Sequence, residues 1–270
     1  MATLFTPHYR HLLAMDTSTE RLSLALAVAD GSPDVARWAI STFEGDSGAK
    51  ASAGMLDAIA GLVRDAGLTL RDLDAIVFGQ GPGAFTGLRT ACAVAQGLAM
   101  SVRPGGIPVI PVNSLLATAQ AARMQQQTVR PEPWVACLDA RMGEIYVARY
   151  AFGDAVTPTT MPIELQPPCL LTPQALIDWL DTQGDGHMGA AVRIAGNALT
   201  VYRDTLADHP ACANWEAALP SARALLHLAP SVWQAGQAVT AADARPLYVR
   251  DKVAQTTAER LVTKAANAGL

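Results

Sequence analysis

The chain has 270 residues, of which 50% are hydrophobic and 16% are charged, and its formal net charge is −4. This composition supports a folded core and excludes an intrinsically disordered protein. The acidic balance also argues against a protein that grips nucleic acid through a basic surface, so a partner is expected to hold any RNA involved.

The cysteines lie far apart and form no Cys-x-x-Cys pair: Cys92, Cys137, Cys169 and Cys212. We expect four buried thiols in a reducing compartment. The first eleven residues contain no apolar signal-peptide core, and the apolar runs elsewhere are too short to span a bilayer. The expectation is a cytoplasmic protein without membrane contact.

The first ordered element is expected to be a β-hairpin. An apolar run, Leu12–Asp16, ends in an aspartate, a polar turn follows, and residues 22–28 then alternate between apolar and other side chains. Further along, Ser52–Leu68 has apolar residues at three- and four-residue steps, among them Met55, Ile59 and Leu62. This spacing predicts an amphipathic helix.

A glycine-rich segment, Gly79–Arg89, follows a short apolar strand and precedes a helical stretch, Leu88–Met100. Its glycines suit either a phosphate at the helix N-terminus or a tight turn with close packing, and both interpretations stay open. The segment matches neither well-known phosphate fingerprint, because Gly87 is followed by Leu88 and not by lysine, and Thr86 stands where a dinucleotide motif needs glycine.

The hairpin pattern recurs in the second half of the chain. Val135–Asp139 is a second apolar run that ends in aspartate, followed by a turn and an outgoing strand. The recurrence predicts two related lobes of α/β architecture, as in the actin, sugar-kinase and chaperone-ATPase superfamily. Two unrelated hairpins are the alternative. Ser18 stands where that superfamily usually has glycine, and Arg141 is bulkier still, which makes a self-contained ATP cleft doubtful.

The rest of the chain gives weaker signals. Prolines between residues 158 and 173 indicate a loop or an irregular edge. Residues 191–196 suggest a short strand, and Leu225–Gln234 a helix that Pro230 should kink or end. Pro246–Arg250 reads as an extended segment.

No catalytic constellation is evident. The five histidines form no His-Glu-x-x-His pair, although His8 and His11 are one helical step apart, and no Gly-x-Ser-x-Gly elbow is present. We therefore expect neither a metal site nor a catalytic residue. Asp139, Arg141 and Glu144 crowd one turn, where they could bind a ligand or form a solvated local ion pair.

Several motifs together resemble the bacterial TsaB family, also called YeaZ. They are the glycine-rich segment, Met15–Ser18, Asp139–Tyr146 and Pro246–Arg250, in the order that the family has them. One departure is Lys50-Ala51-Ser52, where many relatives carry a His-Ser or His-Thr pair before the first long helix.

The resemblance implies the two-lobe actin-like fold, with duplicated mixed sheets flanked by helices. It divides the chain into an N-terminal lobe, 1–112, whose residues 1–10 are an extension, and a C-terminal lobe, 113–270. The last segment of the C-terminal lobe is expected to cross back to the first lobe.

The resemblance also implies a non-catalytic subunit that forms a heterodimer with TsaD. TsaD transfers the threonylcarbamoyl group to the adenosine beside the anticodon of tRNAs that read codons beginning with adenine. TsaE joins the complex, tRNA is contacted only indirectly, and a homodimer is expected when the chain is alone. No cofactor of its own is implied, although ATP or ADP is expected at the interface with TsaD. An autonomous kinase or ATPase of the same superfamily, and a glycoprotease-like metalloprotein, remain alternatives.

Two sets of site residues follow. The expected interface with TsaD, or with a second copy, is an exposed stripe on the two N-lobe helices: Met55, Ile59, Leu62, Ala91, Ala95 and Ala99. The expected vestigial or interfacial nucleotide contacts are Asp16, Gly81, Gly83, Thr86, Arg89, Asp139 and Arg141.

Overall fold

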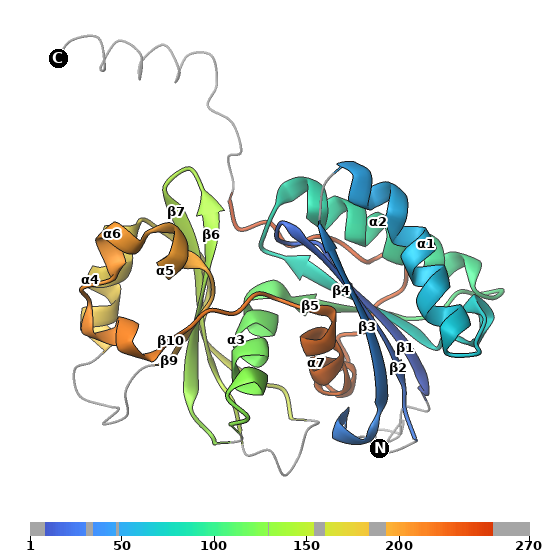
Figure 1. The fold of residues 1–270 in the computed structure, drawn as a ribbon. Helices are drawn as coiled ribbons and strands as arrows, with labels where there is room; N and C mark the ends of the chain where they lie inside the picture. The colour runs from blue at the N-terminus through green and yellow to red at the C-terminus, as the bar shows by residue number, and fades with distance from the viewer. Residues whose placement is uncertain are drawn as a thin grey trace, which may run out of the picture.

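A computed structural model describes residues 9–30, 35–46, 49–128, 130–153, 160–183 and 193–250. The described chain forms two lobes, each built on a five-stranded mixed sheet (Figure 1). The N-terminal sheet contains β1 (His11–Asp16), β2 (Arg21–Val28), β3 (Ala39–Asp46), β4 (Ala75–Gly81) and β5 (Val109–Asn113). The C-terminal sheet contains β6 (Pro133–Arg141), β7 (Glu144–Ala151), β8 (Ile163–Leu171), β9 (Arg193–Ala195) and β10 (Trp215–Glu216).

The two sheets repeat one topology. Their strand orders are β3-β2-β1-β4-β5 and, read from the matching edge, β8-β7-β6-β9-β10. In each sheet the first three strands in sequence are antiparallel, and the last two are added parallel to the first. The predicted duplicated two-lobe α/β fold is therefore confirmed, and both Asp-bearing hairpins lie where the apolar runs predicted them.

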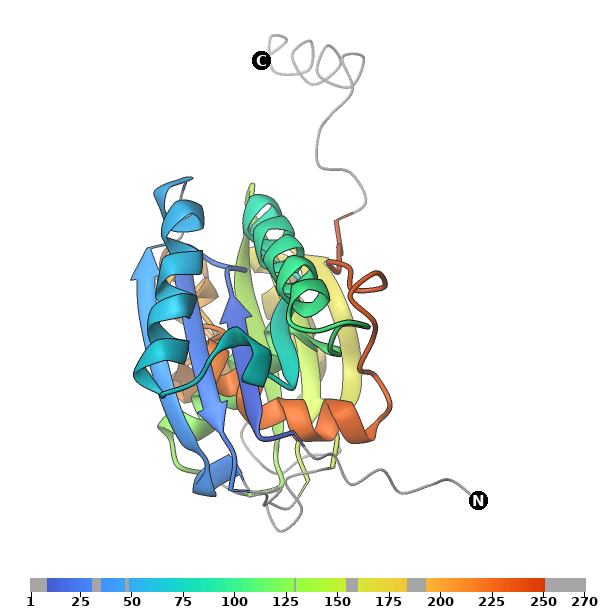
Figure 2. The ribbon, with the colours of Figure 1, turned by 90° about the vertical axis from the view of Figure 1, so that its right-hand side faces the viewer.

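Helices cover the outer faces of both sheets (Figure 1), and Figure 2 looks onto the helices that cover the N-terminal sheet. The N-terminal lobe carries α1 (Ala49–Asp65) and α2 (Phe85–Ser101), and the C-terminal lobe carries α4 (Pro173–Gln183), α5 (Ala198–Val201) and α6 (Arg203–Leu206). Alternating strand residues such as Leu13, Met15 and Phe78 pack against α1 and α2, while Val135 and Val147 pack under the C-lobe helices.

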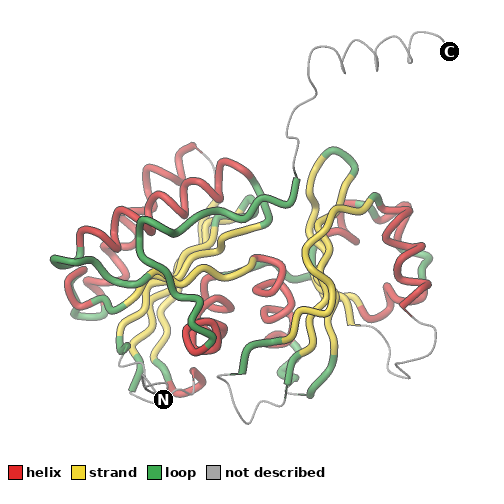
Figure 3. Tube along the Cα trace, turned by 180° about the vertical axis from the view of Figure 1, so that it is seen from behind, coloured by secondary structure: helices red, strands yellow, loops and turns green. Residues whose placement is uncertain are grey.

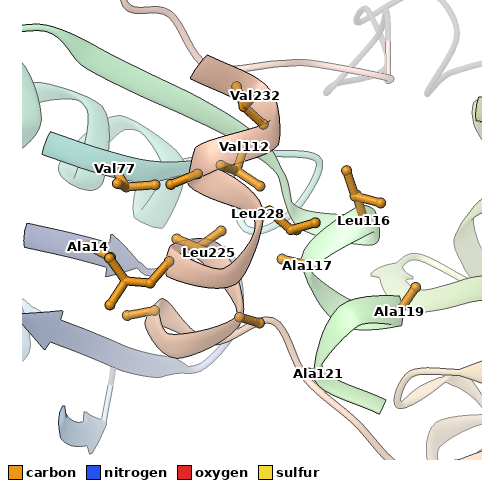
Figure 4. Packing of buried hydrophobic residues seen from close by; sticks show 14 of the residues in the cluster. Ala14, Val77, Val112, Leu116, Ala117, Ala119, Ala121, Leu225, Leu228 and Val232 are labelled. Atoms are coloured by element: carbon orange, nitrogen blue, oxygen red, sulfur yellow. The ribbon is translucent and has the colours of Figure 1, made fainter. Parts of the chain in front are cut away.

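Two further helices lie between the sheets: α3 (Ser114–Gln125) and α7 (Ala222–Gln234). Although α7 comes from the C-terminal half, it packs on the strands of the N-terminal sheet, and α3 contacts strands of both sheets. In Figure 4, Leu225 and Leu228 of α7 lie between Val77 of β4 and Ala117 of α3. A single buried apolar cluster thus joins the two lobes at the base of the cleft between them.

Several local predictions need correction. Helix α1 begins at Ala49 and ends at Asp65, whereas Ser52–Leu68 was expected. Lys50–Ser52, where many relatives carry a His-Ser or His-Thr pair, therefore lies in its first turn. Helix α7 begins at Ala222, because the Ser221 hydroxyl caps it by accepting from the Ala224 N–H at 3.2 Å, and it continues through Pro230. The proline-rich stretch includes β8, which is an edge strand as the prolines require.

Cys92 and Cys137 are buried as expected, but Cys169 and Cys212 are half-buried at the edge of the C-lobe cluster. Within the described ranges, no helix combines the length and the apolar character needed to cross a membrane.

Candidate functional site at the cleft between the lobes

The turns of both Asp-bearing hairpins face one pocket between the lobes, with a volume of about 480 Å³. This size suits a small-molecule ligand. Polar lining comes from both lobes and includes Ser18, Glu20, Asp139 and Arg141. Apolar and aromatic lining comes from Phe85, Leu88, Leu138, Tyr146, Leu219 and Tyr248.

Asp16 lies behind this pocket and is 1% exposed. Its Oδ1 accepts from the Ser18 N–H at 3.0 Å and from the Ser18 hydroxyl at 2.7 Å, whereas its Oδ2 is buried without a hydrogen-bond partner. Burial raises the pKa of Asp16 to about 6, against the opposing effect of the Ser18 hydrogen bonds. The carboxylate therefore stabilises its own turn and does not line the pocket.

The glycines of the loop after β4 make room for the first hairpin turn. A Cβ on Gly79 would stand 1.9 Å from the Asp16 Oδ2, and a Cβ on Gly83 would stand 2.3 Å from the Ser18 carbonyl oxygen. That carbonyl also accepts from the Ala84 N–H at 2.7 Å, at the N-terminus of α2. The position at which a helix N-terminus binds a phosphate thus holds a backbone carbonyl of the same chain, which favours the close-packing interpretation.

The other predicted nucleotide contacts differ in their surroundings. Gly81 has a φ of +115°, and a Cβ there would meet the Leu247 carbonyl oxygen at 2.6 Å, so the C-terminal segment occupies the space beside it. The Arg89 guanidinium lies 3.7 Å over the Phe85 ring, outside the lining of the pocket. Thr86 is exposed, and its carbonyl accepts from the Thr90 hydroxyl at 3.0 Å.

The second Asp-bearing turn repeats the first. Asp139 Oδ1 accepts from the Arg141 N–H at 2.9 Å, as Asp16 Oδ1 accepts from Ser18, and it also accepts from the Tyr202 hydroxyl at 2.8 Å. Burial and then this hydrogen bond raise the pKa of Tyr202 to about 12, so the phenol remains a donor. The Arg141 guanidinium pairs with Asp139 at 3.3 Å and with Glu20 of the first lobe. Of the two interpretations that the sequence left open for this turn, the local ion pair is present, and it extends across the cleft to Glu20.

The structure does not support an exposed interface stripe at the predicted residues. Ala91, Ala95 and Ala99 are fully buried between α2 and the sheet. Met55 and Ile59 are each only 1% exposed. Leu62 is half-buried and packs against the same cluster. The predicted exposure of this stripe is therefore wrong, because the small side chains let α2 approach its own sheet.

The outward faces of the same helices carry a different apolar set. Leu56 is 54% exposed on α1, and Met100 is 68% exposed on α2. The exposed small residues Ala60, Ala93 and Gly97 belong to the same helices. The sequence pattern missed this face because small residues occur on both sides of α2.

Sequence reasoning also missed the contacts of Tyr202 with Asp139, of Glu20 with Arg141, and of Arg250 with the Glu144 carboxylate. Tyr202 lies in a region that offered no motif, and the partners of the other two are distant in sequence.

Two histidines in the described part of the chain contact residues that are distant in sequence. The His11 Nδ1 lies 2.8 Å from the Asp72 carbonyl oxygen, and the His209 Nε2 lies 3.2 Å from Asp181. His8 lies outside the described residues. Within the described ranges, no three His, Cys, Asp or Glu side chains are placed to hold a metal ion.

Comparisons with known proteins identify the family. A family model described as "TsaD: tRNA N6-adenosine threonylcarbamoyltransferase" matches residues 49–258. The protein named "tRNA threonylcarbamoyladenosine biosynthesis protein TsaB" from Haemophilus influenzae is 32% identical over 90% of this chain and 94% of its own length. The protein of that name from Escherichia coli is 30% identical over 90% of this chain and 96% of its own length.

A solved structure agrees. The structure titled "YeaZ from Pseudomonas aeruginosa" is 31% identical and superposes with a TM-score of 0.68, covering 88% of this chain and 99% of the other. The chain belongs to the TsaB (YeaZ) family.

Proposed function

We propose that this protein is a non-catalytic subunit in the synthesis of threonylcarbamoyladenosine in tRNA and that its partner is the transferase TsaD. Relatives at 30–32% identity that it matches over nearly their full length are named as biosynthesis proteins of this modification. In this proposal the protein works in the cytoplasm, because the modification that it supports is made on tRNA.

One observation carries the non-catalytic assignment. The glycine loop and the α2 N-terminus, which would receive a phosphate in a kinase of this fold, are filled by the Asp16–Ser18 turn of the same chain. The backbone N–H of Ala84 is already satisfied by Ser18. A phosphate at this place would have to displace buried backbone contacts.

TsaD is proposed to bind the outward face of α1 and α2. Leu56 and Met100 provide large exposed apolar side chains, and small residues such as Gly97 let a partner helix approach. The same face would form a two-fold homodimer in the absence of TsaD. In this proposal TsaE joins the heterodimer, ATP or ADP lies at the interface with TsaD, and tRNA is bound through the partners.

The decisive experiment is reconstitution of the modification with purified TsaD, TsaE and tRNA, with and without this chain, and with TsaC to make the threonylcarbamoyl-adenylate that donates the group. Modified tRNA should form only when the chain is present. The variant Asp16→Asn should leave product formation within about twofold of the wild type, because Asp16 has no chemical step to perform. Loss of product by an Asp16→Asn protein that still binds TsaD would contradict the proposal.

The cleft pocket gives the kinase or ATPase alternative its one supporting observation, because its 480 Å³ could hold a small ligand. ATP turnover by the chain alone at about 1 per second or more would favour that alternative. Stoichiometric zinc or iron in the pure protein would favour the metalloprotein.

A further inference from the structure

The segment that follows α7 lies along the outside of the N-terminal lobe (Figure 3). Val239 pairs with Val109 of β5 through two backbone hydrogen bonds, of 2.8 and 2.9 Å. The Ala244 carbonyl then accepts from the Gln96 side chain on α2 at 3.0 Å. Ala241 and Ala244 are buried in the N-lobe cluster, so the segment is an integral part of this lobe.

The segment continues to the mouth of the cleft and stays anchored there. The Leu247 N–H donates to the Gln80 carbonyl at the end of β4, at 2.7 Å. The Tyr248 ring lies 5.2 Å from the Phe85 ring, and its hydroxyl accepts from the Arg89 Nε at 3.1 Å. Residues 247–250 also line the pocket.

Arg250 then crosses to the C-terminal lobe. Its guanidinium donates to the carbonyl oxygens of Ala140 at 3.2 Å and Arg141 at 3.3 Å, and it pairs with the Glu144 carboxylate. These acceptors all belong to the β6–β7 turn. The Arg250 side chain is only 16% exposed, which makes this a stronger contact than a solvated surface pair.

The lobes are thus joined at both ends of the cleft. The apolar layer of α3 and α7 joins them at the base. At the mouth, the Arg141–Glu20 pair is highly exposed and contributes little, which leaves Arg250 as the main connection. We propose that residues 239–250 are a strap, that Arg250 fastens it to the C-terminal lobe, and that the chain itself thereby fixes the angle between the lobes. The pocket then keeps one width, in contrast to folds that close by a hinge around their ligand.

The test compares Arg250→Ala with Arg245→Ala in the full chain. Arg245 is an exposed arginine on the same segment, so the control makes the same change of charge. Spin-labelled unnatural amino acids replace Asp57 on α1 and Asp178 on α4. Pulsed electron paramagnetic resonance then measures the distance between the two labels, and hence between the lobes. We expect one narrow distance distribution for the wild type and for Arg245→Ala, and a distribution about twice as broad for Arg250→Ala.

Hydrogen exchange checks that the substitution has released the strap. Exchange at residues 245–250 and 138–146 should rise about tenfold in Arg250→Ala and stay unchanged in Arg245→Ala. If circular dichroism shows that Arg250→Ala is unfolded, Arg250→Lys provides the test. Lysine keeps the positive charge but lacks the planar guanidinium group that donates to several acceptors at once. A released strap with an unchanged distance distribution would overturn the proposal.

Discussion

The Thr17 hydroxyl donates to the Gly87 carbonyl oxygen at 2.7 Å, and a Cβ on Gly87 would stand only 1.9 Å from the Thr17 carbonyl oxygen. The first hairpin turn and the first turn of α2 are therefore in direct backbone contact. This contact explains why a segment that resembles a phosphate loop needs glycine without needing a phosphate.

Gly87→Ala should destabilise the protein by about 2 kcal/mol or more, because neither backbone can move far without disturbing the sheet. The control is Gly97→Ala in the same helix, where an added Cβ meets no atom within 4 Å. Alanine there should stabilise the helix by up to about 1 kcal/mol. Urea denaturation measures both, and equal effects of the two substitutions would contradict the packing argument.

The buried carboxyl of Asp16 predicts a specific pH dependence. Burial raises its pKa in the folded state from 3.8 to about 6, so the folded protein binds this proton more tightly than the unfolded chain. The resulting stabilisation is present below pH 3.8 and is lost as the pH rises through about 6, a difference of about 3 kcal/mol.

Asp16→Asn removes this titration and keeps an oxygen that can accept from Ser18. The unfolding free energy of the variant relative to the wild type should therefore rise by about 2 kcal/mol between pH 4 and pH 7, because at pH 4 the carboxyl of the unfolded chain is already partly ionised. Urea melts at several pH values measure it. A constant difference across this range would show that Asp16 titrates normally.

The proposed TsaD face can be tested without disturbing the core. Gly97→Trp should abolish co-purification with TsaD, because a large side chain on the outward side of α2 blocks the approach of a partner helix. The monomer should stay folded, because the site is open to solvent. Asp178→Trp on the exposed side of α4 is the control. Unchanged binding of TsaD by Gly97→Trp would place the interface elsewhere.

Ala95→Trp would be a misleading test of the same interface. Ala95 is fully buried, so tryptophan there should destabilise the monomer by about 3 kcal/mol or more. Thermal melting followed by circular dichroism would show this directly. A melting temperature equal to that of the wild type would contradict the burial of this residue.

The isolated chain should bind tRNA weakly. Its net charge is −4, so it gains little binding free energy from neutralising the phosphates of tRNA. We expect a Kd for tRNA above about 10 µM at physiological salt. Filter binding at several salt concentrations measures it. Sub-micromolar binding that weakens steeply with added salt would reveal a basic surface that the composition does not suggest.

The sequence predicted the elements that depend on local periodicity. The runs ending in Asp16 and Asp139 identified both hairpins, because alternating burial in a strand leaves a direct pattern in the chain. The duplicated fold followed from their similarity. The motif containing Arg250 was also recognised, but its function depends on Glu144, 106 residues away, and no local pattern encodes such a contact.

The orientation of α2 could not be predicted for a different reason. Ala91 and Ala95 face the sheet, while Ala93 and Gly97 face outward. Because all four residues are small, composition does not distinguish the two sides of the helix. Only the position of the sheet determines which set is buried.

The placement of α7 on the sheet of the opposite half has a consequence for synthesis on the ribosome. The N-terminal sheet is complete once β5 has been made, but the part of its inner face that α7 covers stays open until Gln234 has emerged, about 120 residues later. At roughly 5–20 residues per second, that interval lasts roughly 6–24 s. During it, Leu12, Val77 and Ile110 lack the apolar cover of α7, and transiently exposed apolar surface of this kind is what chaperones shield during synthesis.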